Sequence, residues 1–514
     1  MIETIKMSLK RLLGDDYTNS VKAGAVFFGE LTESTADMLI NEEIEYYPDS
    51  FSKKADALLD KVGLNVLPQI KSTIAGAGTD SFNKAGSTDS APVGGLGCFR
   101  LGEDGRLYLI SKSEHYHTPL GHWFPGYKLL DNASRLGIGN ATHNNTRGYI
   151  TRLHERELIR VINCIPKENQ VELDRVICNR EDKILNRVIN LQTGSLAAEA
   201  GIKMMLARFY RLDTGFCNPL YHGKIPVFFV VGDFEEGCAA NYHGTTITAQ
   251  TLRGMWPDIY TKSEKAGIYQ VCPVRINDID DFEEKMEKYN RHPYKTAGFL
   301  HEIIMMNYGA IKLEKEYLKA AYQICKKYDT PVLVDEIQSC MWYKGMFLFN
   351  LYDLKPDFVV IGKGFPGGRF AGSRIITTAS MDSLNQFGAL VTNGQEELTS
   401  LAYLITMSFA ERNGNHMEQI GDYYEYKLNL LAGKYDRLIE SIEGLGLLKG
   451  IKFYSIEKAV KFSEYLKSKC IDISAQTYKA SCPPTALTKL PVISTEKVID
   501  FTVDKMEEAL IYID

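Results

Sequence analysis

The chain has 514 residues, of which 45% are hydrophobic and 24% charged, the proportions of an ordinary soluble protein. A net charge of −6 argues against nucleic acid as a main partner, and no apolar run reaches the roughly 20 residues that span a membrane. The ten cysteines form no C-x-x-C pair, and the amino terminus lacks a signal-peptide hydrophobic region. We therefore expect a reduced, cytoplasmic protein of two or three domains, without a zinc site or a disulfide framework.

Residues 1–95 form an amino-terminal extension. Apolar residues at helical spacing predict a helix over residues 53–67, which Pro68 ends. The stretch over residues 73–97 is rich in glycine, serine, threonine and alanine and is typical of a loop or linker. A hairpin is predicted over residues 97–110, and it opens the segment 96–150, which we expect to be the first part of a small domain.

Residues 151–395 alternate helical patterns with apolar strands, predicted at residues 227–231, 330–334 and 358–361. This alternation favours βαβ units and a mostly parallel sheet, and therefore a large α/β domain. From residue 396 to 514 the pattern is a helix, short strands and a closing helix, which we expect to complete the small domain.

Two of the apolar strands lead into reactive side chains. The first ends at Asp335, with Gln338 just beyond it, and the second is followed by Lys363 between two glycines. Continuous apolar runs are typical of strands buried in parallel sheets, and ligands bind at the carboxyl ends of such strands. Asp and Lys are the groups that a pyridoxal 5'-phosphate (PLP) site needs, because the lysine forms a Schiff base and the carboxylate keeps the pyridinium nitrogen protonated.

A glycine turn precedes a helix predicted over residues 197–209. Gly194, Ser195 and Leu196 would present unpaired backbone N–H groups at the positive end of the helix dipole, which suits a phosphate. A plain helix cap is the alternative interpretation.

Five motifs, in chain order, resemble those of the class III aminotransferases, the group of ornithine and γ-aminobutyrate aminotransferases. They lie at residues 120–125 (L-G-H-W-F-P), 193–200 (T-G-S-L-A-A-E-A), 242–246 (Y-H-G-T-T), 335–338 (D-E-I-Q) and 388–398, which contain T-N-G. The resemblance covers residues 97–514. It implies a fold-type I PLP enzyme with a large, doubly wound, mostly parallel sheet domain and a smaller α/β domain made from both flanks of the chain.

The resemblance also implies roles for single residues. Lys363 would be the catalytic lysine, Asp335 would pair with the ring nitrogen of PLP, and Gln338 would bond the phenolic oxygen of the ring. Tyr242 resembles the aromatic residue that stacks on the ring, and Glu302 resembles a glutamate near the substrate side.

Thr392 resembles the hydroxyl residue that reaches the phosphate of the neighbouring subunit's cofactor. The resemblance therefore implies a homodimer with shared active sites. A core tyrosine at Tyr242 and an ordinary loop threonine at Thr392 are the alternative interpretations.

The sequence departs from the family pattern on the substrate side. Residues 113–117 read S-E-H-Y-H, residues 343–346 read Y-K-G-M, and Thr245 and Glu443 stand in place of arginines. The carboxy-terminal strand that often holds a carboxylate-binding arginine has a lysine, in A-L-T-K-L-P at residues 486–491. Lysine replaces a planar guanidinium poorly, so we expect an amine, an ω-amino group or an unusual acid as substrate.

His115 and His117 would share one face of a strand, and we interpret them as the lining of a pocket or an interface, with a metal site as the alternative. Arg147 and Arg152 are spare candidates for binding a substrate anion.

The function that these residues predict is PLP-dependent transfer of an amino group from an amine or amino acid to a keto or aldehyde acceptor. A PLP-dependent racemase, aminomutase or lyase on the same scaffold is the alternative. A non-catalytic binding protein that retains the fold is a further hypothesis, against which the intact Lys363 and Asp335 argue.

Overall fold

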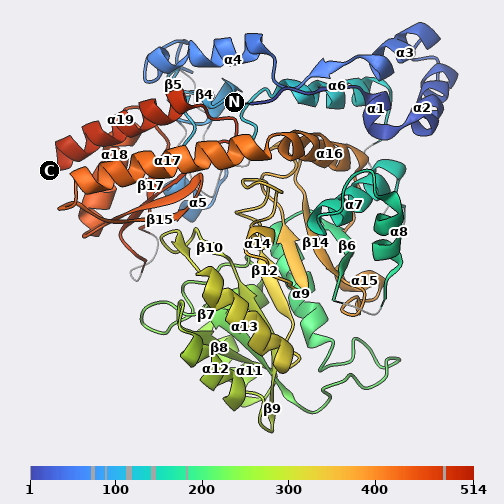
Figure 1. Ribbon diagram of the computed structural model, residues 1–514, viewed down its shortest axis with the longest axis vertical. Coiled ribbons are helices and arrows are strands. Elements are labelled where there is room, and N and C mark those ends of the chain that lie inside the picture. The colour runs from blue at the N-terminus through green and yellow to red at the C-terminus, as the bar shows by residue number, and fades with distance from the viewer. Residues whose placement is uncertain are drawn as a thin grey trace.

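The computed structural model describes residues 2–70, 74, 76–86, 89–111, 118–139, 146–180, 183–477 and 482–514 (Figure 1). The amino-terminal elements, in blue, and the carboxy-terminal elements, in orange and red, lie together at one end of the molecule. The middle of the chain, in green and yellow, forms the other end around a large sheet. No helix in the described ranges combines the length and the apolar character that a membrane span requires.

The large sheet has the strand order β6-β14-β13-β12-β9-β7-β8. Its strands are β6 (Leu185–Leu191), β7 (Ile225–Val231), β8 (Gln270–Val274), β9 (Tyr294–His301), β12 (Val332–Asp335), β13 (Phe358–Ile361) and β14 (Ser373–Thr378). β8, β7, β9, β12 and β13 run parallel, and β14 is antiparallel to both of its neighbours. β12 and β13 are buried throughout, as their apolar sequences predict, and β7 and β9 are buried except at their first residues. The expected mostly parallel α/β sheet is confirmed.

Helix α9 (Gly194–Leu206) packs against the sheet because glycines let the two approach closely. A Cβ at Gly201 of α9 would lie 2.5 Å from Leu333, and one at Gly298 of β9 would lie 2.2 Å from Met205 of α9. Neither position has room for a side chain. This packing fixes the height of α9 on the sheet and brings its amino terminus to the carboxyl ends of the strands.

The remaining elements around the large sheet are helices and short strands. They are α7 (Tyr149–Ile162), α8 (Gln170–Cys178), α10 (Ile247–Leu252), α11 (Pro257–Lys265), α12 (Ile279–Lys288), β10 (Ile304–Met305), β11 (Ile311–Lys312), α13 (Lys315–Lys327), α14 (Leu348–Leu351) and α15 (Gln386–Ala389). α12 and α13 pack on each other, and α7 packs on β6 and on the long helix α16 (Glu397–Arg412).

A second, antiparallel sheet lies near the carboxyl terminus, with the strand order β15-β16-β18-β17. Its elements are β15 (Ile439–Leu445), β16 (Leu448–Phe453), β17 (Ser474–Ala475) and β18 (Thr485–Lys489), with helices α17 (Gly414–Lys434), α18 (Ile456–Ser468) and α19 (Glu496–Ile513). β3 (Pro92–Leu96), β4 (Phe99–Gly102) and β5 (Leu107–Leu109) form a third sheet, and Leu109 N–H donates to the Cys470 carbonyl. Both flanks of the chain therefore meet at this end of the molecule, and the divisions at residues 95, 150 and 395 stay predictions.

The amino-terminal extension is helical, but the predicted helix over residues 53–67 is wrong in extent. Its elements are β1 (Lys6–Met7), α1 (Leu9–Leu13), α2 (Asp15–Phe27), α3 (Glu33–Asn41), β2 (Ile44–Glu45), α4 (Asp49–Asp56), the 3-10 turn η1 (Leu59–Lys61) and α5 (Asp80–Ala85). The helix ends at Asp56, residues 57–62 form local turns, and the chain then bonds to β5 instead of continuing as a helix: Gly63 N–H donates to the Leu107 carbonyl at 2.9 Å, and Leu107 N–H donates to the Leu64 carbonyl at 3.2 Å. Hydrogen bonding to the edge of β5 therefore replaces the helix that the apolar spacing of residues 53–67 predicts. η2 (Pro125–Tyr127) and α6 (Lys128–Arg135) then lead toward the large sheet.

Candidate active site

Asp335 and Lys363 lie at the carboxyl ends of adjacent strands, as predicted. β12 ends at Asp335 and pairs in parallel with β13, where Asp335 stands opposite Val360. Lys363 follows the end of β13 and has a φ of +43°, a left-handed conformation that is uncommon for a lysine. Such backbone strain is often found at functional sites, where the surroundings hold it in place.

A cavity of about 250 Å³ opens at these strand ends. It is lined by Gly194, Ser195, Tyr242, Gly244, Glu302, Asn307, Asp335, Ile337, Gln338 and Lys363. All the predicted site residues except Leu196 and Thr392 therefore meet in one cavity. Three uncharged lining residues were not predicted: Gly244 and Ile337 lie within two of the motifs, whereas no local pattern distinguishes Asn307.

The Asp335 carboxylate is buried and held by two donors. Its Oδ2 lies 3.0 Å from Nδ1 of His243, and its Oδ1 accepts the N–H of Ile337 at 3.0 Å. Because a carboxylate only accepts, Nδ1 carries the proton, while His243 Nε2 is buried without a hydrogen-bond partner among the described residues. The hydrogen bond from His243 Nδ1 therefore orients the Asp335 carboxylate.

His243 was not predicted, although it stands directly after Tyr242 in the Y-H-G-T-T motif. Its place within this motif, directly after Tyr242, is the one signal by which the sequence could have identified it. Behind it, His301 is buried at the end of β9 and its Nε2 lies 2.9 Å from the Tyr322 hydroxyl. Burial lowers the pKa of His301 to about 3, so this second imidazole is neutral at physiological pH.

The start of α9 lies against the loop that follows Tyr242. Thr245 N–H donates to Ser195 Oγ at 3.0 Å, and a Cβ at Gly244 would lie 2.6 Å from the Ser195 Cα. Thr193 caps the helix, since its side-chain Oγ1 accepts the Leu196 N–H at 3.4 Å, and its carbonyl also accepts this N–H at 3.1 Å. The Leu196 N–H is therefore engaged within the cap, whereas Gly194 and Ser195 face the cavity.

The other predicted residues differ in their surroundings. Gln338 is buried, and its Oε1 has no hydrogen-bond partner in the described part of the chain. Tyr242 lies with its ring 4.6 Å from the guanidinium carbon of Arg253. Glu302 is buried at the end of β9, and Thr392 is exposed on the segment that precedes α16.

Glu336, next to Asp335, is fully buried beneath the site. Its carboxylate accepts the Phe349 N–H at 2.7 Å and the hydroxyl of Ser339. Burial raises the pKa of Glu336 to about 7, although these hydrogen bonds lower it.

The residues that depart from the family pattern on the substrate side differ in their surroundings. Lys489, at the end of β18, is buried and its Nζ lies 3.8 Å from the centre of the Trp342 ring. Trp342 in turn packs on Gly364, where a Cβ would lie 2.6 Å from the indole. Lys489 is therefore separated from the Lys363 backbone segment by one side chain.

Arg147, Arg152 and Glu443 do not line the cavity. Arg147 pairs with Glu155 at 3.1 Å, and Arg152 donates to the Arg147 carbonyl. Glu443 accepts a hydrogen bond from Ser441 within β15. Residues 113–117, with His115 and His117, lie outside the described residues.

The sequence profile of the class III aminotransferase family matches residues 96–494. The chain therefore belongs to the class III aminotransferases, which use PLP. It is an enzyme that moves an amino group from an amine or amino acid to a keto or aldehyde acceptor. The predicted family, enzyme class and cofactor are thus confirmed.

Individual proteins agree with this assignment. The acetylornithine aminotransferase of Clostridium acetobutylicum is 28% identical over 359 residues, which cover 68% of this chain and 85% of that protein. The solved adenosylmethionine-8-amino-7-oxononanoate aminotransferase of Methanocaldococcus jannaschii has a TM-score of 0.65 and 20% identity, and the match covers 90% of this chain and 99% of that one.

A phospholyase from Arthrobacter, solved in complex with phosphoethanolamine, has a TM-score of 0.63 and 18% identity, over 82% of this chain and 94% of that one. At this identity the likeness shows the fold alone. The fold-type I architecture therefore does not separate transfer from elimination, and it is the family match that favours the aminotransferase over a racemase, aminomutase or lyase.

Proposed function

We propose that the cavity around Asp335 and Lys363 binds PLP and that amino transfer takes place there. The observation that carries the proposal is a carboxylate and an amine at the ends of two adjacent parallel strands, lining one cavity. Bound PLP supplies an electron-accepting ring that stabilises negative charge on the substrate carbon next to nitrogen. Lys363 would bind PLP through its ε-amine, and its free amine would act as the general base that moves a proton at that carbon.

Asp335 would pair with the protonated ring nitrogen of PLP. A buried carboxylate needs a cationic or donating partner, and the His243 ring meets only one of its oxygens. A pyridinium nitrogen would provide the compensating charge. His243 would then be a positioning residue, because its hydrogen bond fixes the orientation of the Asp335 carboxylate.

The phosphate would lie at the amino terminus of α9. Gly194 and Ser195 line the cavity there, and the N–H groups of a first helical turn have no acceptor within the helix. Leu196 would contribute through the same turn, although its own N–H bonds to Thr193. The tight contact between Gly244 and Ser195 keeps this turn in place.

Gln338, Tyr242 and Glu302 would surround the ring. The Gln338 amide lines the cavity, and its oxygen has no partner among the described residues, so it can turn to donate an N–H to the phenolic oxygen of PLP. Tyr242 would stack on the ring face, and Glu302 would lie toward the substrate.

We further propose a cytoplasmic homodimer with shared active sites. Thr392 is exposed and does not line the cavity of its own chain, which is compatible with a role at the neighbouring subunit's phosphate. The net charge of −6 supports a partner set of small molecules and argues against nucleic acid or a membrane surface.

The proposed amino donor is a small amine or amino acid of the kind that the aminotransferase relatives use. Acetylornithine is the substrate named for one relative. Lys489, buried against Trp342 beside Gly364, would attract the anionic group of such a substrate. Because an ammonium makes fewer directed hydrogen bonds than a guanidinium, we propose looser carboxylate recognition than an arginine gives.

A visible absorption spectrum of the protein with PLP tests the site. We expect an absorption band of bound PLP in the wild type that is lost in Lys363→Ala and kept in Lys355→Ala, a control at an exposed position. An amino donor should bleach this band and a keto acid should restore it. An unchanged band in Lys363→Ala would place PLP on another residue, and turnover without bleaching would argue for a racemase or lyase.

A further inference from the structure

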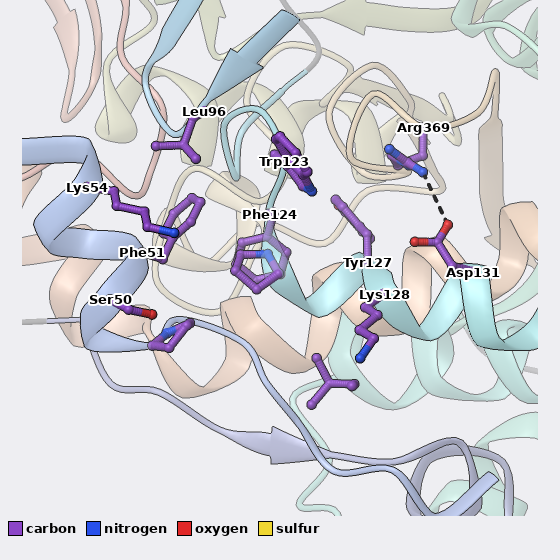
Figure 2. A pocket seen from close by; sticks show the side chains of 13 residues that line it. Ser50, Phe51, Lys54, Leu96, Trp123, Phe124, Tyr127, Lys128, Asp131 and Arg369 are labelled. Carbon is purple, nitrogen blue, oxygen red and sulfur yellow. Dashed lines mark ion pairs between the residues drawn. The ribbon is translucent and has the colours of Figure 1, made fainter. Parts of the chain in front are cut away.

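A second cavity, of about 430 Å³, lies where the amino-terminal extension meets the core (Figure 2). We call it the Trp123 pocket. Its wall includes Phe51 and Lys54 of α4, Trp123 of the L-G-H-W-F-P segment, Lys128 of α6, and Arg369. Arg369 belongs to the segment that follows Lys363, so the pocket joins the extension to the part of the chain that holds the catalytic lysine.

Aromatic rings line the middle of the Trp123 pocket (Figure 2). Phe51 and Phe124 are buried, while Trp123 is 79% exposed and has a φ of +50°. A large aromatic residue in the left-handed region is uncommon, and an exposed indole over a cavity offers a flat apolar surface to a ligand. The pocket is therefore suited to a planar ring.

Positive charge surrounds these rings. Figure 2 shows Lys54 on one side of the pocket and Lys128 and Arg369 on the other. The Lys54 ammonium has neither an ion pair nor a hydrogen bond to any described residue, whereas Arg369 forms an ion pair with Asp131 at 3.9 Å, marked in Figure 2. Lys128 is paired with Glu42. Asp131 is the one carboxylate among the lining residues that the structure describes, so the pocket attracts anions.

We propose that the Trp123 pocket binds a small anion that carries a flat ring, such as an aryl carboxylate or an aryl phosphate. The ring packs between Trp123 and Phe51, and the anionic group meets Lys54. A ligand in this position links α4 to the segment after Lys363, where Tyr127 already packs against Gly367 with no space for a side chain. This site is separate from the cavity around Lys363, with which it shares no lining residue.

Calorimetric titration of the full-length, PLP-loaded protein with 1-naphthoate tests the proposal. Lys54→Ala should weaken binding about tenfold, the usual cost of losing a charged hydrogen bond. Lys53→Ala removes the same charge from the same helix but lies outside the pocket, so it should bind like the wild type. Neutral 1-naphthol lacks the anionic group, so it should bind to the wild type more weakly than 1-naphthoate does. Its affinity should be the same for the wild type, Lys54→Ala and Lys53→Ala.

Trp123→Ala provides a second, independent variant, and it should also weaken naphthoate binding. Loss of binding in Lys54→Ala and Trp123→Ala, but not in Lys53→Ala, places the ligand in the Trp123 pocket rather than at PLP. The proposal is overturned if the wild type does not bind naphthoate, or if Lys54→Ala and Lys53→Ala bind it equally well.

Discussion

The two sides of the candidate active site are built from different sheets. Asp335 and Lys363, on the side where we propose that PLP binds, extend from adjacent strands of the large sheet. Lys489, for which we propose a role in substrate binding, comes from β18 of the carboxy-terminal sheet. The sequence matches the family motifs on the first side and departs from them on the second. On these proposals, chemistry and substrate recognition rest on separate elements, so that one can change without displacing the other.

The strongest test of this division changes a residue on the proposed PLP side alone. Asp335→Asn keeps the shape of the side chain but removes the charge that would hold the ring nitrogen protonated. We expect kcat to fall roughly 10²–10³-fold, the scale of a lost electrostatic contact in a buried site. Steady-state kinetics with saturating PLP measures this loss.

Asp329→Asn is the control, because Asp329 is an exposed carboxylate outside the cavity. It should leave kcat unchanged. If Asp335→Asn keeps more than half of the wild-type kcat, the Asp335 charge is not needed for the reaction. The proposed separation between a PLP side and a substrate side would then be wrong.

The buried Glu336 beneath the proposed PLP site should lower the free energy of unfolding as pH rises. The pKa of its buried carboxyl is about 7 in the folded protein and 4.5 as a free side chain. Between these values the folded state keeps a proton that the unfolded state has released, so stability falls as pH rises and the loss is complete above about pH 7. At about 1.36 kcal/mol for each pKa unit, the free energy of unfolding should fall by roughly 3 kcal/mol over this window.

Glu336→Gln cannot titrate and should lose this component of the pH dependence. Urea unfolding at about pH 5 and at about pH 8 gives the free energy of unfolding of both proteins. The difference between variant and wild type should rise by roughly 3 kcal/mol in favour of the variant from the lower to the higher pH. Glu418→Gln, at an exposed position, should follow the wild type. Parallel profiles for Glu336→Gln and wild type would mean that Glu336 does not take up a proton on folding.

Sequence reasoning located the cofactor side because its signals are local. Apolar runs buried on both faces identify β12 and β13, and parallel neighbours necessarily bring their carboxyl ends together. These local patterns are sufficient to place Asp335 and Lys363 in one site. The same reasoning predicted the hairpin of β4 and β5 from its turn residues.

Contacts between distant segments could not be predicted in this way. The hydrogen bond between His243 and Asp335 depends on the lateral order of the strands, which a single sequence does not encode in any local pattern. The predicted helix over residues 53–67 failed for a related reason, because its second half bonds to β5 instead. The position of Lys489 over Trp342 likewise requires two sheets to be placed against each other.

The smallest expected effect concerns Lys489 on the substrate side. Lys489→Met keeps the length of the side chain and removes its charge, so packing against Trp342 should persist. For an amino donor with a carboxylate we expect KM to rise about tenfold with kcat little changed, because binding is lost equally from the ground and transition states. Lys489→Arg should restore KM, and the absorption band of bound PLP should be the same in all three proteins.

Lys449→Met is a matched control, since Lys449 is a buried lysine on the neighbouring strand β16 whose ammonium pairs with Glu425 instead. An amino donor without a carboxylate is the second control, and its KM should not depend on Lys489. If Lys489→Met lowers kcat for both donors and shifts the PLP band, the charge acts on the cofactor rather than on the substrate. The two sides would then be coupled through Trp342 and Gly364, and a change in substrate would require a compensating change around Lys363.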